Sequence, residues 1–173
     1  MRRVKALLFI VSSLFMVVPS VVFAEDKVAV VNVVEAIFRS DVAQARLKQA
    51  ESGSDFVALK AKYESSSADL QALAKEAESK RLTWSQEQTL EHQKKMEYAK
   101  ADADLALRKI QAENKQLQQK IVQELGPKAS EALQEVINEE GVTVLLKSDA
   151  VVFHKPESDI TAKVADRLNQ KTK

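Results

Sequence analysis

Residues 41–125 contain no proline and a single glycine, Gly53, and they are rich in Ala, Leu, Gln, Glu and Lys. Because such residues favour helix while proline and glycine interrupt it, the stretch predicts unusually long helices. Its apolar stripe is thin and Ala-rich, and a helix of this length needs a partner for that stripe. The stretch is therefore expected to project as an arm rather than to form the core of a globular domain.

One interruption is predicted near the middle of this stretch, at residues 80–86. Thr83 with Gln86, or Ser85 with Gln88, stands at the spacing of a capping box, and either pair would begin a new helix. Two helices joined by a short turn would fold back as an antiparallel coiled-coil hairpin, with limbs about 60 Å long. The alternative is one continuous helix that pairs with another chain.

Both limbs carry residues at heptad spacing, and these residues are expected to form the seam between the two helices. In the first limb they are Phe56, Leu59, Tyr63, Ser66, Leu70, Leu73, Ala77 and Lys80, and in the second Met96, Ala103, Leu107, Ile110, Asn114, Leu117 and Ile121. Small and polar residues recur among them, so the seam is weak and the arm is expected to bend.

The N-terminus has the pattern of a secretory signal peptide over residues 1–24. Three basic residues within the first five positions precede an apolar run at residues 6–18, and Ala24 ends a Val-Phe-Ala cleavage motif. A membrane anchor is the alternative, but the run is short of the roughly 20 residues that a spanning helix needs. Glu25, not cysteine, would follow the cut, so the mature chain is expected to be soluble and without a lipid anchor.

Composition argues against several classes of function. Without the predicted signal peptide, 23 basic residues face 25 acidic ones, so no broad basic excess favours nucleic acid. The chain has no cysteine for disulfides, and its two histidines, His92 and His154, have no second ligand at metal-binding spacing. Three scattered glycines build no phosphate loop. We therefore expect no enzymatic activity, no metal and no cofactor.

The segment before the arm, residues 27–33, is β-branched and almost continuously apolar, as expected of a strand covered on both faces. After the arm, Gly126 and Pro127 are expected to end the helical run. A new helix would follow and stop at Gly141, which is a good C-terminal cap. Its apolar face would consist of Ala129, Leu133, Val136 and Ile137.

Residues 142–146 and 150–154 are predicted to form two strands of a hairpin. Asp159 can then cap a closing helix with Ile160, Val164 and Leu168 at four-residue spacing. The predicted fold class is thus α+β, with a small body made of residues 25–40 and 126–173. The arm, residues 41–125, is inserted between the two parts of this body.

A body of about 60 residues buries too little of its chain to be comfortably stable, and its strands leave open edges. Pooling strands between subunits would solve both problems, so we expect a homo-oligomer joined through the body. Val30, Val33, Leu145 and Val151 are the apolar positions expected at that interface. The alternative is a monomer in which the closing helix covers the sheet.

Four arm residues are candidate contacts for a partner protein: Leu82 and Trp84 at the tip, and Met96 and Tyr98 beside it. Aromatic and methionine side chains are apolar and adapt to different surfaces. The alternative is that these four side chains only pack the turn.

Several of these segments together resemble the Skp/OmpH family of periplasmic chaperones, and the similarity spans the mature chain. The segments that carry the resemblance are the opening strand at residues 28–33 with the following Ile37-Phe38 helix, the polar helical hairpin, residues 142–146 and 149–153, and the ending Asp159-Ile160-Thr161-Ala162.

The resemblance implies a homotrimer in which strands from three subunits form a β-barrel-like body and three arms enclose a cavity. It also implies that the protein works in the periplasm without ATP, where it would capture unfolded outer-membrane β-barrel proteins. The family is often strongly basic, whereas residues 41–125 hold 14 basic and 14 acidic residues. Contact with lipopolysaccharide or a membrane is therefore expected to be weak.

Two other functions fit parts of the sequence. A periplasmic spacer or adaptor could dock one folded partner through the arm. A peripheral membrane protein could use Lys80, Arg81 and Trp84, although two cations are few for that purpose.

Overall fold

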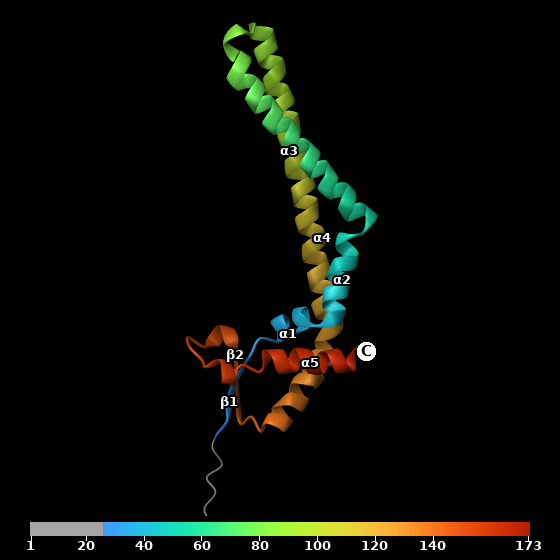
Figure 1. Cartoon of the computed structure of the whole chain (residues 1–173), viewed down its shortest axis with the longest axis vertical. Coiled ribbons are helices and arrows are strands. Elements are labelled where there is room, and N and C mark those ends of the chain that lie inside the picture. Colours follow the sequence, from blue (N-terminus) through green and yellow to red (C-terminus); the bar gives the residue numbers. More distant parts are fainter. Residues whose placement is uncertain (1–25) are drawn as a thin grey trace, which may run out of the picture.

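The computed structural model describes residues 26–173, so the predicted signal peptide and Glu25 lie outside the described residues. A small body stands at one end of the molecule and a long helical arm rises from it (Figure 1). Helix dominates both parts. The elements in chain order are β1 (Val28–Val31), α1 (Val33–Arg39), α2 (Asp41–Glu51), α3 (Ser54–Lys80), η1 (Arg81–Thr83), α4 (Gln86–Glu140), β2 (Val144–Lys147), η2 (Ser148–Ala150), η3 (Pro156–Ser158) and α5 (Thr161–Lys171).

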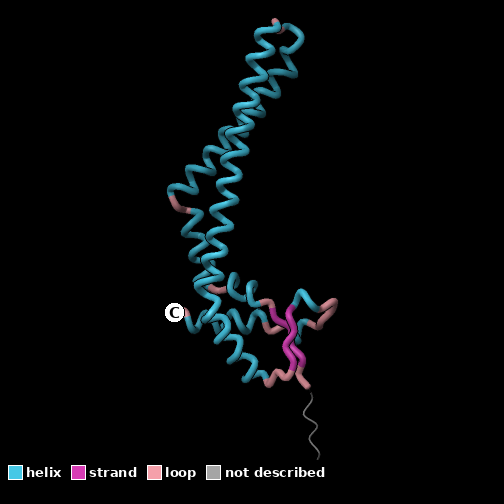
Figure 2. The backbone as a smooth tube through the Cα atoms, turned by 180° about the vertical axis from the view of Figure 1, so that it is seen from behind, coloured by secondary structure: helices cyan, strands magenta, loops and turns pink. Residues whose placement is uncertain are grey.

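The arm is an antiparallel helical hairpin, as predicted, and not one continuous helix. Its first limb consists of α2 and α3, its second limb is α4, and η1 makes the turn (Figures 1 and 2). Ser85 is the N-cap of α4: its hydroxyl accepts from the Gln88 amide at 3.2 Å, and its own amide donates to the Gln88 side chain at 2.9 Å. Of the two candidate capping boxes, the structure forms the second.

The predicted seam of α3 is confirmed, because its heptad positions from Phe56 to Ala77 are buried or half-buried and only Lys80 is exposed. On α4, the predicted positions Met96, Ala103, Ile110, Leu117 and Ile121 also face inward.

Two α4 positions were predicted wrongly. Ala106 is buried in place of Leu107, which is exposed, because a small side chain lets the two helices approach closely there. Asn114 is also exposed. It lines a hollow with Gly53 and Phe56, where the first limb breaks between α2 and α3 and bows away from α4.

The helix break predicted at Gly126 and Pro127 is wrong, since α4 runs unbroken from Gln86 to Glu140. Proline removes one backbone donor from a helix, and its ring crowds the preceding residue, above all that residue's Cβ. Gly126 has no Cβ, so part of this crowding is absent. Packing of α4 on both sides of Pro127 then holds the helix together, and the helix ends at Gly141 with φ 63°, as predicted.

The body contains a two-stranded sheet in which β1 and β2 run parallel, with Val28 opposite Val144 and Val31 opposite Lys147. The prediction of a first strand covered on both faces is confirmed for Ala29, Val30 and Val31, which are all buried. The strand is shorter than predicted because Asn32 caps α1, with its side-chain oxygen accepting from the Glu35 amide at 3.0 Å.

The predicted hairpin after α4 is wrong in its second half. The chain forms a 3-10 turn at Ser148–Ala150, and residues 151–155 have no strand assignment. Three consecutive apolar residues, Val151 to Phe153, need cover on both faces of a sheet. This chain alone supplies none, so β-propensity does not suffice to form the strand.

The hydrophobic core lies where α4, α5, α1 and β1 meet. Helix α5 buries Val164, Ala165 and Leu168 against the lower part of α4, as its predicted four-residue spacing requires. Asp159 accepts from the Thr161 amide at 2.8 Å at the start of α5. Ala43, Ile121 and Leu125 belong to the same core, so it reaches into the root of the arm.

Candidate functional site

The arm tip presents one apolar side chain fully to solvent. Leu82 lies in the 3-10 turn between α3 and α4 and is 93% exposed. The turn around it is held by backbone and side-chain bonds, since the Arg81 amide donates to the Ala77 carbonyl and the Thr83 hydroxyl donates to the Lys80 carbonyl at 2.7 Å. Leu82 thus has a defined backbone position although its side chain contacts little.

Trp84, the second predicted tip residue, is half-buried and packs against His92, with the ring centroids 4.4 Å apart and the ring planes at 37°. The His92 Nε2 lies 3.0 Å from the Leu73 carbonyl oxygen of α3. A carbonyl can only accept, so Nε2 carries the proton. His92 therefore joins both limbs to the turn, a role that its solitary place in the sequence did not reveal.

Met96 and Tyr98, the two contact residues predicted beside the tip, lie in different surroundings. Met96 is half-buried in the seam of α4, and Tyr98 is exposed on the side of the helix away from the seam. The four predicted residues therefore form no single patch.

Further exposed apolar side chains lie along the arm: Val57, Leu90 and Leu105, which the sequence reasoning did not single out, and Leu107, which it placed in the seam. Leu105 stands seven residues after Tyr98, which places both on one outward line of α4. A search for apolar residues outside the predicted heptad seam would have found Val57, Leu90 and Leu105. The arm thus carries isolated apolar side chains on several faces.

At the body, the apolar positions predicted for an oligomer interface differ in exposure. Val30 is only 2% exposed within the single chain, while Val33, Leu145 and Val151 are half-buried. The apolar side chains that the body leaves open are their neighbours Val28, Val34, Val144, Leu146, Val152 and Phe153. In β2 the alternation of side chains along a strand explains the difference, because Val144 and Leu146 face the side opposite to Leu145.

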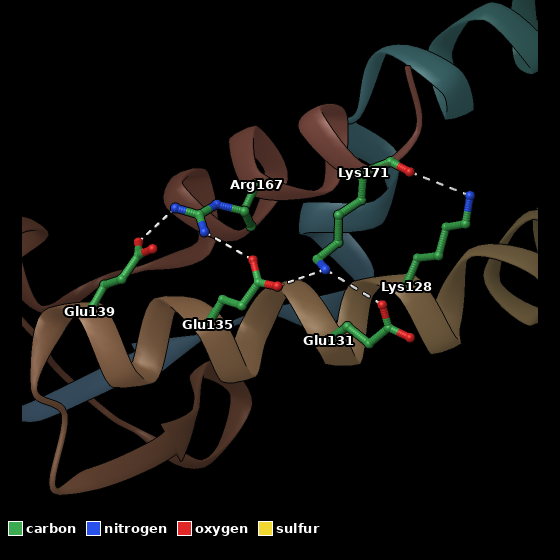
Figure 3. A network of polar contacts seen from close by, with 6 residues as sticks. All are labelled: Lys128, Glu131, Glu135, Glu139, Arg167 and Lys171. Atoms are coloured by element: carbon green, nitrogen blue, oxygen red, sulfur yellow. Dashed lines mark hydrogen bonds and ion pairs between the residues drawn. The ribbon is translucent and has the colours of Figure 1, made fainter.

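Charged side chains form a ladder between α4 and α5 at the base of the arm (Figure 3). Arg167 bridges Glu135 and Glu139 at 2.9 and 2.7 Å, and Lys171 bridges Glu131 and Glu135 at 3.5 and 2.7 Å. Hydrogen bonds from Lys171 and then Arg167 lower the pKa of Glu135, and those from Glu135 and Glu139 raise the pKa of Arg167.

Glu140 extends this ladder to the first strand. Its carboxylate accepts from Lys163 of α5 and from Lys27, and these bonds lower its pKa from an ordinary 4.5 to about 2. The end of α4 is thereby tied to both the N-terminal and the C-terminal segments of the body.

Residues 26–173 bring together no group of three His, Cys, Asp or Glu side chains suited to a metal ion. None of the helices in that part of the chain has the length and hydropathy needed to cross a membrane.

The chain thus belongs to the class of proteins in which a long helical hairpin projects from a small body, here with a parallel β1–β2 pair. This chain belongs to the OmpH-like family: the family profile described as outer membrane protein (OmpH-like) matches residues 27–168. It is 30% identical over 168 residues to a Skp-like protein of Pseudomonas aeruginosa, with 93% of this chain and 94% of that protein covered. The resemblance to the Skp/OmpH family is therefore confirmed.

Among solved structures, a candidate OmpH-like outer membrane chaperone from Caulobacter crescentus CB15 is 23% identical to this chain. The match covers 86% of each chain and has a TM-score of 0.47.

Proposed function

We propose that this protein is a periplasmic holdase chaperone, exported through a cleaved signal peptide over residues 1–24. It would act as a homotrimer, without ATP or any other cofactor, and capture unfolded outer-membrane β-barrel proteins between its helical arms. Membership of the OmpH-like family and the similarity to a Skp-like protein support a chaperone role.

The observation that carries this proposal is the surface of the arm. Exposed apolar side chains are spread from Val57 through the tip to Leu107, interleaved with charges of both signs. An unfolded protein offers many weak apolar segments, and many weak contacts at high effective concentration sum to strong binding without sequence selectivity. Binding of this kind removes unfolded protein from the aggregating pool by mass action, so no chemical step is needed.

The open edge of the body supports assembly of several copies. Val152 and Phe153 are almost completely exposed, and Val144 and Leu146 of β2 lie open nearby. Pairing of residues 150–154 with a strand of another copy would satisfy their backbone groups and cover these side chains. In such an assembly, residues 150–154 would form the predicted strand as part of a β-barrel-like sheet shared between copies.

Charge plays a minor part in the proposed capture. The equal numbers of acidic and basic residues in 41–125 give no long-range field, and exposed pairs are screened over about 8 Å at physiological salt. Apolar burial is hardly weakened by salt. Contact with lipopolysaccharide or lipid is expected to stay weak, and nucleic acid is not an expected partner.

The experiment that tests this function dilutes several unrelated outer-membrane barrel proteins from urea into buffer with the mature protein and follows light scattering. Suppression of aggregation for all of them supports a holdase. Binding to one folded partner, without suppression, would support the adaptor instead.

Native mass measured at micromolar concentration tests the trimer. Phe153→Asp should reduce the trimer to smaller species because an interface would bury an unpaired charge. Val57→Asp on the arm is the control and should leave the mass unchanged. A wild-type mass of one chain would contradict the trimer.

A further inference from the structure

The arm tip contains a polar contact at a place where a coiled coil ordinarily continues its apolar seam. His92 lies four residues before Met96 and eleven before Ala103, which puts it on the seam of α4, and it is only 8% exposed. Burying an imidazole without a partner is costly, so its N–H needs an acceptor. The Leu73 carbonyl of the opposite limb supplies that acceptor at 3.0 Å.

The same ring has a second contact, because Trp84 packs against it from the turn with a centroid distance of 4.4 Å. We call the Leu73 carbonyl, His92 and Trp84 the tip lock. An apolar residue in place of His92 could pack on Trp84 but could not donate to Leu73, and a polar amide could donate but offers no ring. The lock needs both features of the histidine.

The tip lock fixes the segment that presents Leu82. Trp84 lies two residues after Leu82, and Ser85, which follows Trp84, is tied to α4 by its capping box. The Thr83 hydroxyl ties the turn to the end of α3 at 2.7 Å. The backbone around Leu82 is therefore held from both limbs while its side chain is 93% exposed.

We propose that His92 is a positioning residue which, through Trp84 and Leu73, holds Leu82 as a preformed apolar contact for aliphatic segments of an unfolded client protein. This inference rests on the proposed holdase function and separates the roles of the predicted tip residues. Leu82 touches the client, whereas Trp84 supports the turn. A fixed backbone lowers the ordering cost of each contact, which matters where single contacts are weak.

Two substitutions separate the contacts of His92. His92→Phe keeps a ring for Trp84 but removes the donor to Leu73, and His92→Gln keeps a donor but removes the ring. Trp84 is the only tryptophan of the chain, so its emission and its quenching by acrylamide report on the tip alone. Emission in His92→Gln should shift to longer wavelength with at least two-fold greater quenching, while His92→Phe should stay closer to the wild type.

Capture is measured with the full mature protein and a small outer-membrane barrel protein unfolded in urea, as the concentration that halves aggregation. Leu82→Ala should raise this concentration about three- to five-fold. Gln93→Ala, at an exposed polar position near the same end of the arm, is the matched control and should change it less than two-fold. Native mass should be the same for all variants, since the tip is remote from the body.

His92→Gln should weaken capture to the same extent as Leu82→Ala, and the double variant should be no weaker than Leu82→Ala alone. This non-additivity is expected because His92 acts through Leu82. The inference would be overturned if the losses in the double variant were additive, or if Leu82→Ala captured normally. It would also be overturned if His92→Gln exposed Trp84 and still captured normally. If Leu82→Ala captured clients normally but no longer bound anionic vesicles, Leu82 would be a lipid contact, and the inference would be overturned as well. A wild-type protein that suppresses no aggregation would refute the holdase function itself, and the inference with it.

Discussion

The two halves of α4 are held in different ways. Toward the tip, α4 meets only α3 and Trp84 of the turn, and the buried side chains between the two limbs are small or polar: Ser66, His92, Ala103 and Ala106. Toward the body, the same helix packs against α1 and α5 in a core that includes β1, and it buries Ile121, Leu125 and Val136 with Ile37 and Leu168. The body half thus combines larger buried side chains with more packed elements, and both differences favour firmer packing there than at the tip.

Ion pairs follow the same division in residues 26–173. Most of those in the arm link residues four apart on one helix, and only Arg46–Glu124 and Lys62–Asp102 join the two limbs. In the body, six pairs link α4 to α5 or to Lys27. The two limbs of the arm are therefore expected to separate at their seam more easily than the body elements separate from one another.

The largest effect is expected from removing the arm above its bend. Replacing residues 54–113 by a short Gly-Ser linker joins Gly53 to Asn114, which line the same hollow at the bend, and keeps Ala43 and Ile121 in the core. We expect an assembled body that no longer captures unfolded proteins. Native mass and aggregation suppression measure the two properties, and full suppression by this shortened protein would show that the arm is not the capturing element.

Two leucine-to-alanine substitutions compare the packing of the body with that of the arm. Leu168→Ala in the body should cost about 2–5 kcal/mol of unfolding free energy, since Leu168 is fully buried. Leu70→Ala on the arm seam should cost about 1 kcal/mol, because Leu70 is half-buried and the limbs can close over the gap. Urea unfolding of each variant at one protein concentration gives both values. Equal costs would mean that the arm is packed as firmly as the body.

Pro127 stands at the boundary between the halves, and its replacement should stabilise the helix. Pro127→Ala restores an amide that can donate to the Gln123 carbonyl, and little packing is lost because Pro127 is exposed. A gain of about 1–3 kcal/mol is expected. Ser130→Ala, an exposed position one turn further along α4, is the control and should change stability by about 0.5 kcal/mol or less. A loss of stability in Pro127→Ala would show that the fold requires the proline.

The ion pairs of the body should make its stability depend on pH. The pKa of Glu140 is about 2 in the folded protein, below its ordinary 4.5, so the charged form is favoured by folding. Its contribution is complete above about pH 4.5 and is lost as the pH falls toward 2. Stability of the wild type should decline over that range, and Glu140→Gln should decline less. Glu78→Gln on the arm serves as control and should follow the wild type.

The sequence predicted what depends on local chemistry. The capping box of Ser85, the cap at Gly141, the α3 seam and the apolar face of α5 are each set by residues close together in the chain. Predictions failed where distant contacts decide. Pro127 is tolerated because α4 is packed on both sides of it, and residues 150–154 lack the partner edge that a strand needs.

The candidate site divides in the same way. Exposure of Leu82 follows from its place in a predicted turn. The contact between His92, Trp84 and Leu73 joins positions up to 19 residues apart, and no local pattern indicated it.

The continuity of α4 through Pro127 has a mechanical consequence. A helix of 55 residues is about 80 Å long, and one end of it begins at the tip turn while the other leads directly into β2. Rocking of its base by about 5° would carry the tip through roughly 7 Å. The helix therefore amplifies motion at its base, and small adjustments among the body elements become wide displacements of the arm tip.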